Sequence, residues 1–500
     1  MKKQIITIAL LSSAIFAPCS VASASNSNEM DLTERMRDSI VYLEISAYGY
    51  SQSEPWKHEN LSESWACGCA VGEYDVVTTA ESAINLVSIR ALRYGQNEFV
   101  GATLKIVDYD TNLCLIRLDP NALDTPLKPL TFSENYEKGA EVQFYWLSSD
   151  SHLYNGRGYL DRASVEATQI SHGRRLCYVA GNTSQRTARG EVYCAGQTPI
   201  GVAFWSNSEK ESALIPAETI NRFLKATNDE NYKGFGEVGF VLSELLDPAM
   251  RSYLNMPASL TDGAYVVDVD NLGTGSDCLK KGDVILSIDG NALDPYGRFM
   301  HPKYQQLLFD YLITRKPAGD SLRFELWRDG KKMEIQKEVK NFNVSQMLVP
   351  YHDYDRQPEF IITAGFVLQR LTREYLMVFG EDMEGQSPSH LYHYYRDLAF
   401  KPTPERQEVV VLSYVLPAPF NIGYTSLGRM VVSKFNGMTI RSIKDIVTAQ
   451  KLNPESKFDV IEFELDNPVV VIPRGQLPTA DQFIQRNYGI EKLSNINASG

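Results

Sequence analysis

The stretch Tyr178–Val202, YVAGNTSQRTARGEVYCAGQTPIGV, decides how the rest of the chain is interpreted. It ends in an apolar strand, Pro199-Ile200-Gly201-Val202, which follows a turn at Gly196-Gln197. The residue twelve positions before Ile200 is Ala188, in a loop that precedes this strand. An alanine methyl group has neither a lone pair nor a proton to give up, so no neighbouring base can turn it into an attacking group.

The length, the hydrophobic content and the N-terminal segment of the chain indicate an exported protein of several domains. A chain of 500 residues suggests roughly three domains at about 150 residues each, and 43% hydrophobic residues are enough for a core in each. Residues 1–24 have the order of a cleaved secretory signal, namely Lys2 and Lys3, an apolar run, and Ala22-Ser23-Ala24. The run is too short to span a membrane. We therefore expect cleavage after Ala24 and a periplasmic or secreted protein, with lipidation of Cys19 as an alternative.

Charge excludes some classes of partner. Cleavage would remove two lysines and no acidic residue, so the formal net charge of −13 would fall by two to −15. A surface this acidic repels nucleic acid and anionic lipid. The sequence contains no phosphate-binding loop, metal motif or cofactor fingerprint, so we expect no cofactor and no metal.

The cysteines leave two questions open. Six of the seven would remain after cleavage, and an even number in an exported chain permits disulfides without specifying them. Cys177 and Cys194 flank the loop around Ala188, on segments expected to be neighbours in a barrel, so a disulfide between them is possible. Cys67 and Cys69 could form a metal site with His58, but two buried thiols are the preferred interpretation.

Residues 38–227 contain many short strands separated by turn signals and few helices, which is typical of an all-β barrel or sandwich. The predicted strands are Ile40–Ile45, Cys69–Val77, Leu113–Leu118, Val142–Trp146, Arg175–Val179 and Ile200–Phe204. After Pro216 the apolar residues follow helical spacing, so a helix is expected to close the domain.

Two further segments resemble the protease domain of the HtrA/Deg family. Thr78-Thr79-Ala80-Glu81-Ser82 stands where that family has T-N-A-H-V, and Asp108 to Ile116, DYDTNLCLI, stands where it has D-x-x-T-D-L-A-L-L. The resemblance implies a trypsin-like double β-barrel. It also implies that Glu81, Asn112 and Ala188 occupy the places of the catalytic histidine, aspartate and serine.

The rest of the chain resembles the two PDZ modules of plant-type Deg proteases, which are α+β units. Residues 235–340 form the first module, in which Val238-Gly239-Phe240 resembles a carboxylate-binding loop and residues 304–314 are expected to be the helix beside a peptide groove. Residues 359–475 form a divergent second module with Ala364-Gly365-Phe366 as its candidate loop, and residues 476–500 are expected to be a C-terminal tail. The predicted fold class is therefore mainly β.

The three changed positions predict a protein without serine protease activity. Glu81 is a far weaker base than imidazole, and Asn112 carries no charge to stabilise an imidazolium. Arg186 stands where the family has a glycine of the oxyanion hole. Ser184 is a possible substitute nucleophile, but its use would shift the register of the loop. The histidines of this domain, His58, His152 and His172, are expected to be surface or hydrogen-bonded loop residues.

The leading hypothesis is a non-catalytic member of the family that binds peptides, C-terminal segments or unfolded polypeptides through its PDZ modules. One alternative is an active serine endopeptidase whose catalytic residues are assigned wrongly here. Another is a structural subunit of a Deg oligomer. The resemblance implies a homo-oligomer, either a trimer or a multiple of one.

Overall fold

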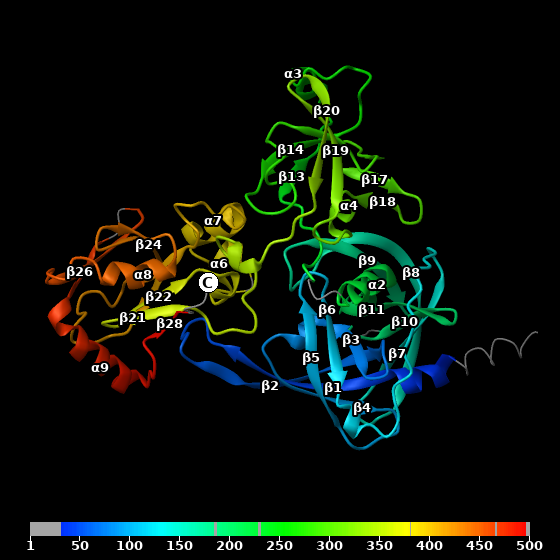
Figure 1. The fold of residues 1–500 in the computed structure, drawn as a ribbon, viewed down its shortest axis with the longest axis horizontal. Coiled ribbons are helices and arrows are strands. Elements are labelled where there is room, and N and C mark those ends of the chain that lie inside the picture. Colours follow the sequence, from blue (N-terminus) through cyan, green and yellow to red (C-terminus); the bar gives the residue numbers. More distant parts are fainter. Residues whose placement is uncertain (1–31, 185–187, 229–231, 381, 466–467, 497–500) are drawn as a thin grey trace, which may run out of the picture.

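The computed structural model describes residues 32–184, 188–228, 232–380, 382–465 and 468–496. The predicted signal segment, residues 1–24, and Arg186 lie outside these ranges. The fold is mainly β, as predicted, with two closed barrels followed by two sheets that belong to the predicted modules (Figure 1). Among the described residues, no helix is both long enough and apolar enough to cross a membrane.

The first barrel closes in the strand order β1-β2-β3-β6-β5-β4. Its strands are β1 (Ile40–Tyr50), β2 (His58–Ala70), β3 (Asp75–Thr79), β4 (Leu86–Arg93), β5 (Val100–Asp108) and β6 (Leu113–Leu118). The expected single strand over residues 69–77 is wrong, because a turn separates β2 from β3. In that turn the N–H groups of Val71 and Gly72 both donate to the carbonyl of Asp75, at 2.9 and 3.1 Å.

The second barrel closes in the order β10-β11-β12-β9-β8-β7. Its strands are β7 (Glu141–Leu147), β8 (Leu153–Ala167), β9 (Arg174–Asn182), β10 (Val192–Ala195), β11 (Thr198–Ser206) and β12 (Glu211–Pro216). Helix α2 (Ala217–Ala226) follows Pro216 and buries Ile220 and Phe223, which confirms the predicted closing helix.

The possible Cys177–Cys194 disulfide does not form in the structure. Cys177 lies on β9 and Cys194 on β10, and both are buried free thiols. The two strands are not neighbours, because β9 pairs with β12 and β8 while β10 pairs with β11 and β7. Burial raises the pKa of both thiols to about 12. They are therefore core residues of the second barrel.

Module 1 is a twisted sheet in the order β13-β14-β15-β19-β20 with a separate hairpin, β17-β18. Its elements are β13 (Phe240–Ser243), α3 (Pro248–Tyr253), β14 (Ala264–Val269), β15 (Val284–Ile288), β16 (Asn291–Ala292), β17 (Arg298–His301), β18 (Gln305–Leu308), α4 (Asp310–Thr314), β19 (Ser321–Arg328) and β20 (Lys331–Glu338). The helix predicted over residues 304–314 is wrong in its first half. Residues 305–308 pair with β17, and only α4 is helical.

Module 2 is a larger sheet in the order β27-β26-β24-β23-β22-β21-β28. Its elements are β21 (Phe360–Thr363), β22 (Phe366–Arg370), α5 (Arg373–Met377), α6 (Met383–Gln386), α7 (Ser389–Leu398), β23 (Val410–Val415), β24 (Met430–Phe435), β25 (Met438–Thr439), α8 (Ile443–Gln450), β26 (Phe458–Phe463), β27 (Val470–Pro473), α9 (Leu477–Tyr488) and β28 (Ser494–Asn495). The expected tail from residue 476 is therefore part of this module. Its helix α9 buries Ala480 and Ile484, and its strand β28 pairs with β21.

A hairpin arm joins the first barrel to module 2. Strands β1 and β2 extend beyond the barrel, and Figure 1 shows them reaching beneath module 2. At the tip, the ring of Trp56 lies 6.2 Å from the rings of both Phe360 and Tyr414. The carbonyl of the preceding residue, Pro55, accepts a hydrogen bond from the side chain of Gln357 at 2.8 Å. Module 2 is thus held to the first barrel by contacts, in addition to its covalent linker to module 1.

We predict that Trp56→Ala weakens the docking of module 2 on the arm. The change removes aromatic surface worth about 1 to 3 kcal/mol, which would raise the undocked population by roughly 5- to 150-fold. Limited proteolysis of the linker over residues 341–358 measures this population. Leu61→Ala is the matched control, because Leu61 lies on the same arm and is 47% exposed. Equal cleavage rates for the two variants would contradict the prediction.

Candidate functional site

The structure places Glu81 and Asn112, two of the three predicted triad positions, next to each other. Glu81 is the second residue of the short helix η1 (Ala80–Ala83), which follows β3, and Asn112 lies in the loop between β5 and β6. The N–H of Glu81 donates to Oδ1 of Asn112 at 3.3 Å, and the N–H of Ala80 donates to its carbonyl at 3.1 Å. The amide of Asn112 therefore holds the η1 turn in place, while the carboxylate of Glu81 is exposed.

Ala188 lies in a loop that packs against β2 and β3. Its side chain is only 3% exposed and belongs to a hydrophobic core cluster. The next residue, Arg189, accepts a hydrogen bond from the N–H of Cys67 at 2.7 Å, and the carbonyl of Cys67 accepts one from Thr78 Oγ1 at 2.7 Å. A buried methyl group thus stands at the position where the family resemblance predicts the nucleophile. Ser184, the possible substitute, lies in an exposed turn.

The histidines of the barrels are engaged elsewhere. The ring of His58 lies 4.7 Å from that of Tyr50 on the arm, and Nδ1 of His152 is 2.9 Å from the carbonyl of Asp150 in an exposed turn. His172, which we expected in a surface or hydrogen-bonded loop, is buried where the modules meet the barrels. Within the described residues, no hydrogen bond joins any of these three rings to Glu81 or Asn112. None of these three imidazoles is therefore in position to act as a general base beside Glu81 and Asn112.

The linker that enters module 2 packs on the loops of the first barrel. The ring of Tyr109 lies 4.9 Å from that of Tyr354 and 5.4 Å from that of His352. The carboxylate of Asp355 accepts hydrogen bonds from the hydroxyl of Tyr109 and from the N–H of Asn85. We call residues 351–355 the strap. It rests on Tyr109, three residues before Asn112, and on Asn85, which follows η1.

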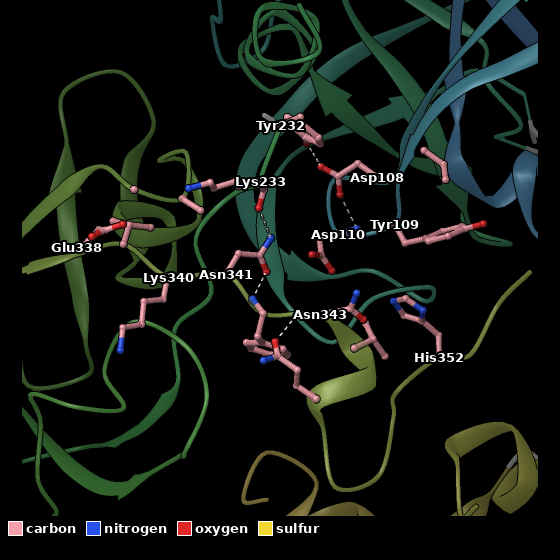
Figure 2. A pocket seen from close by; sticks show the side chains of 18 residues that line it. Asp108, Tyr109, Asp110, Tyr232, Lys233, Glu338, Lys340, Asn341, Asn343 and His352 are labelled. Atoms are coloured by element: carbon pink, nitrogen blue, oxygen red, sulfur yellow. Dashed lines mark hydrogen bonds between the residues drawn. The ribbon is translucent and has the colours of Figure 1, made fainter. Parts of the chain in front are cut away.

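A cavity of about 630 Å³ lies beside the strap, between the barrel loop, module 1 and the linker (Figure 2). Many of its polar groups bond to one another. The hydroxyl of Tyr232 donates to Asp108, and the amide of Asn341 donates to the carbonyl of Lys233 at 3.1 Å. The cavity is therefore the space between the first barrel, module 1 and the linker. The hydrogen bonds in its walls connect the linker to residues 232–233, and these to Asp108 at the end of β5.

The candidate carboxylate loop of module 1 has free donors. The carbonyls of Glu237 and Val238 accept hydrogen bonds from Thr274 and Gly275 at 2.8 and 2.9 Å, whereas the N–H groups of Val238 and Gly239 have no partner among the described residues. Gly239 has φ +75°, and a Cβ there would lie 2.3 Å from the carbonyl oxygen of Leu272. Glycine is therefore required by close packing within the module.

The strand after this loop has an open edge. β13 pairs only with β14, and Val241 on it is 49% exposed. Phe240, which we expected to line a ligand pocket, is only 5% exposed, and its ring stacks on that of Phe309 at 5.2 Å. Phe240 is thus a core residue. The donors and the open edge remain as the features that could receive a peptide.

The candidate loop of module 2 has a different structure. Ala364 and Gly365, with φ values of 47° and 90°, form the turn of a hairpin between β21 and β22, and Phe366 begins β22. β22 is covered on one side by β21 and on the other by β23. The N–H of Ala364 already donates to the carboxylate of Asp481 at 2.9 Å. The expected peptide site at Ala364-Gly365-Phe366 is therefore closed by the module's own strand and carboxylate.

The fold defines a protein with a trypsin-like double barrel, a PDZ domain and a further sheet module. The PDZ domain family matches residues 349–495, which include module 2. Protease Do-like 2, chloroplastic, of Arabidopsis thaliana is 27% identical over 465 residues, which are 90% of this chain and 73% of that protein. A Serine protease HtrA-like of Staphylococcus aureus is 29% identical over 137 residues, 27% of this chain and 17% of that one. Over most of its length the chain is therefore similar to a Do-like protease, and over residues 349–495 to the PDZ domain family.

A solved structure, HtrA-type protease AlgW with decapeptide, is also similar to this chain. It has a TM-score of 0.48 and 15% sequence identity, and the match covers 63% of this chain and 99% of that one.

We predict that Asp481→Ala destabilises module 2 without opening a peptide site. The change leaves the N–H of Ala364 without its partner, which costs about 1 to 3 kcal/mol, while β21 still covers the edge of β22. Denaturant unfolding measures the first effect, and binding of peptides with free carboxyl termini tests the second. Gln482→Ala, on the exposed face of the same helix, is the control. New peptide binding in the Asp481 variant would show that the carboxylate, and not β21, closes the module.

Proposed function

We propose that this chain is a non-catalytic HtrA/Deg-like protein that binds the free C-termini of peptides or unfolded polypeptides through module 1. The observation that carries the proposal is the pair of unpartnered N–H groups at Val238 and Gly239, at the head of the open strand β13. A peptide that extended the sheet along β13 would bring its terminal carboxylate to these donors. The equivalent donor in module 2, at Ala364, already has a carboxylate partner.

Three features of the barrels support the absence of proteolysis. The nucleophile position is the buried methyl of Ala188, the base position is the carboxylate Glu81, and the amide of Asn112 accepts a hydrogen bond from the main chain. Serine proteolysis needs a hydroxyl, a base to remove its proton and a group that orients the base. None of the three residues supplies its part. The barrels would then serve as the support on which both modules are docked.

Export and assembly are part of the same proposal. The secretory pattern of residues 1–24, with cleavage after Ala24, would place the protein in the periplasm or outside the cell. The family resemblance favours a homo-oligomer built from trimers, in which this chain could also act as a structural subunit. No cofactor or metal enters the proposed binding.

We predict that a peptide with an apolar, free C-terminus binds the mature chain at least about tenfold more tightly than the same peptide amidated. The amide removes the charge that strengthens hydrogen bonds from Val238 and Gly239, and each such bond is worth roughly 1.5 to 3 kcal/mol. Fluorescence anisotropy with matched acid and amide peptides measures the ratio. Substitution of Gly239 is a poor test because it would damage the fold. Equal affinities across a set of apolar C-termini would refute terminus recognition.

We predict that Ala188→Ser alone creates no peptidase activity. The hydroxyl would return, but Glu81 and Asn112 would still provide neither an imidazole base nor a group to orient one. Cleavage of unfolded casein and labelling by a fluorophosphonate probe measure activity, with wild type and Ser184→Ala as comparisons. Labelling of the wild type that is lost in Ser184→Ala would instead favour an active endopeptidase with a different nucleophile.

A further inference from the structure

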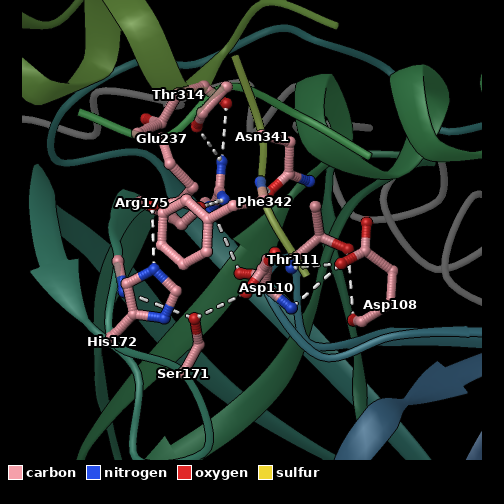
Figure 3. Close-up of polar contacts among 12 residues, drawn as sticks. Asp108, Asp110, Thr111, Ser171, His172, Arg175, Glu237, Thr314, Asn341 and Phe342 are labelled. Carbon is pink, nitrogen blue, oxygen red and sulfur yellow. Dashed lines mark hydrogen bonds and ion pairs between the residues drawn. The ribbon is translucent and has the colours of Figure 1, made fainter. Parts of the chain in front are cut away.

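A buried cluster around His172 lies where the barrels, both modules and the linker meet (Figure 3). His172 lies in the loop between β8 and β9 of the second barrel. Its ring is 5.2 Å from the ring of Phe342, which is in the linker, and 5.2 Å from the ring of Phe400, which is in module 2. Tyr351, at the start of the strap, packs against the same ring at 6.1 Å. One imidazole thus contacts three segments outside the barrels.

The same imidazole also contacts module 1. Nε2 of His172 lies 3.2 Å from one carboxylate oxygen of Glu237, and Arg175 of β9 donates to the other. Arg175 further donates to the carbonyl of Thr314 in module 1 at 2.8 Å and to that of Asp110 in the first barrel at 3.0 Å. Glu237 immediately precedes Val238 and Gly239. The cluster therefore fixes the start of the candidate carboxylate loop relative to both barrels.

Module 2 reaches the same end of module 1 through the residues around Phe400. The carbonyl of Phe400 accepts a hydrogen bond from the N–H of Asn271 at 3.0 Å, and the carbonyl of Pro402 accepts one from the Asn271 side chain at 2.8 Å. Between them, Lys401 forms an ion pair with Asp268. Phe400 therefore links His172 to the loop that follows β14, and this loop packs against Gly239.

Charged and titratable groups face His172 from each neighbouring segment. They are Glu237 and Asp270 of module 1, Asp110 of the first barrel, Arg175 of β9 and His352 of the strap. Burial alone would lower the pKa of His172, but the carboxylates of Glu237 and Asp110 raise it above its ordinary value. Burial raises the pKa of Asp110 to about 6 and that of Asp270 to about 6. Burial, with His172 nearby, lowers the pKa of His352 to about 3.

We propose that His172 is a proton-controlled latch, which holds both modules on the barrels when it is protonated and releases them when it is neutral. The protonated ring pairs with Glu237 while it stacks on Phe342 and Phe400. Loss of the proton leaves Glu237 buried with Arg175 as its only charged partner among the described residues, and it removes the cation from the aromatic contacts. The terminus-binding loop and the strap would then move away from the second barrel together.

The direction of the pH effect follows from the raised pKa. A histidine whose pKa is higher in the docked state contributes stability that is fully present below its free value of about 6.5, and this contribution is lost as pH rises through the docked value. Asp110 and Asp270 act in the same direction, but their titration is nearly complete by about pH 7. Burial also raises the pKa of Glu374 in module 2 to about 7, so a transition above pH 6.5 is assigned to His172 by its loss in a variant that lacks this imidazole.

The test is small-angle X-ray scattering of the mature chain between pH 5.5 and 8.5, at a concentration where its oligomeric state is constant. We expect the radius of gyration to increase as pH rises through a single transition above pH 6.5. In His172→Phe, which keeps an aromatic ring against Phe342 and Phe400, the transition should disappear. The matched control is His152→Phe, because His152 is exposed in a turn of the same barrel. The control should keep the wild-type profile.

A second pair of variants keeps the test decisive if His172→Phe does not fold. Glu237→Gln removes the counter-charge and should move the transition down by about one pH unit or more. Asp110→Asn should leave a transition above pH 6.5 in place. The latch is wrong if the wild type shows no transition, if His172→Phe retains it, or if it disappears with Asp110→Asn. Scattering does not depend on the proposed peptide binding, so either proposal can fail while the other stands.

Discussion

The ion pair between Arg175 and Glu237 fixes module 1 on the barrels, and module 2 in turn contacts module 1. The two side chains are only 7% and 4% exposed, and the pair joins the second barrel to the first residues of module 1. Removal of one partner from a buried pair typically costs about 3 to 5 kcal/mol, because the other charge is left without compensation. Arg175 also donates hydrogen bonds to the carbonyls of Asp110 and Thr314. A single guanidinium thus sets the relative positions of three folded parts.

The two modules contain similar glycine loops, but the strand after the first loop has an open edge and the strand after the second is paired on both edges. In module 1, the loop at Gly239 leads into an edge strand and keeps free N–H groups. In module 2, the loop at Gly365 is the turn of a hairpin, so the strand that a ligand would extend is already paired with β21. Gly365 also approaches its neighbours closely, because a Cβ there would lie 2.7 Å from the carbonyl oxygen of Leu416. Module 2 therefore resembles a PDZ module whose edge is already occupied by its own chain.

The sequence predicted those parts of the fold that depend on local patterns. Alternating apolar residues located the barrel strands, and helical spacing after Pro216 located α2. The same reasoning failed at residues 304–308, where spacing compatible with a helix belongs to the hairpin β17-β18. It also failed for Cys177 and Cys194, because barrel closure determines which strands are adjacent. No local pattern could identify the buried environment of His172, since its neighbours come from residues 110, 237, 342 and 400.

The arm of the first barrel constrains the order in which the chain can fold. The contacts of the arm with module 2 and its linker join residues that are far apart in the sequence. The hydrogen bond from Gln357 to Pro55 spans 302 positions, and the one from Gln369 to Gln52 spans 317. Contacts between such distant residues form late, because the entropy of closing the intervening chain must be overcome first. During synthesis, the side chain of Trp56 on the arm therefore stays exposed until its partners Phe360 and Tyr414 have been synthesised. The nascent protein would be most exposed to chaperones and proteases at this hairpin, well before its C-terminal half exists.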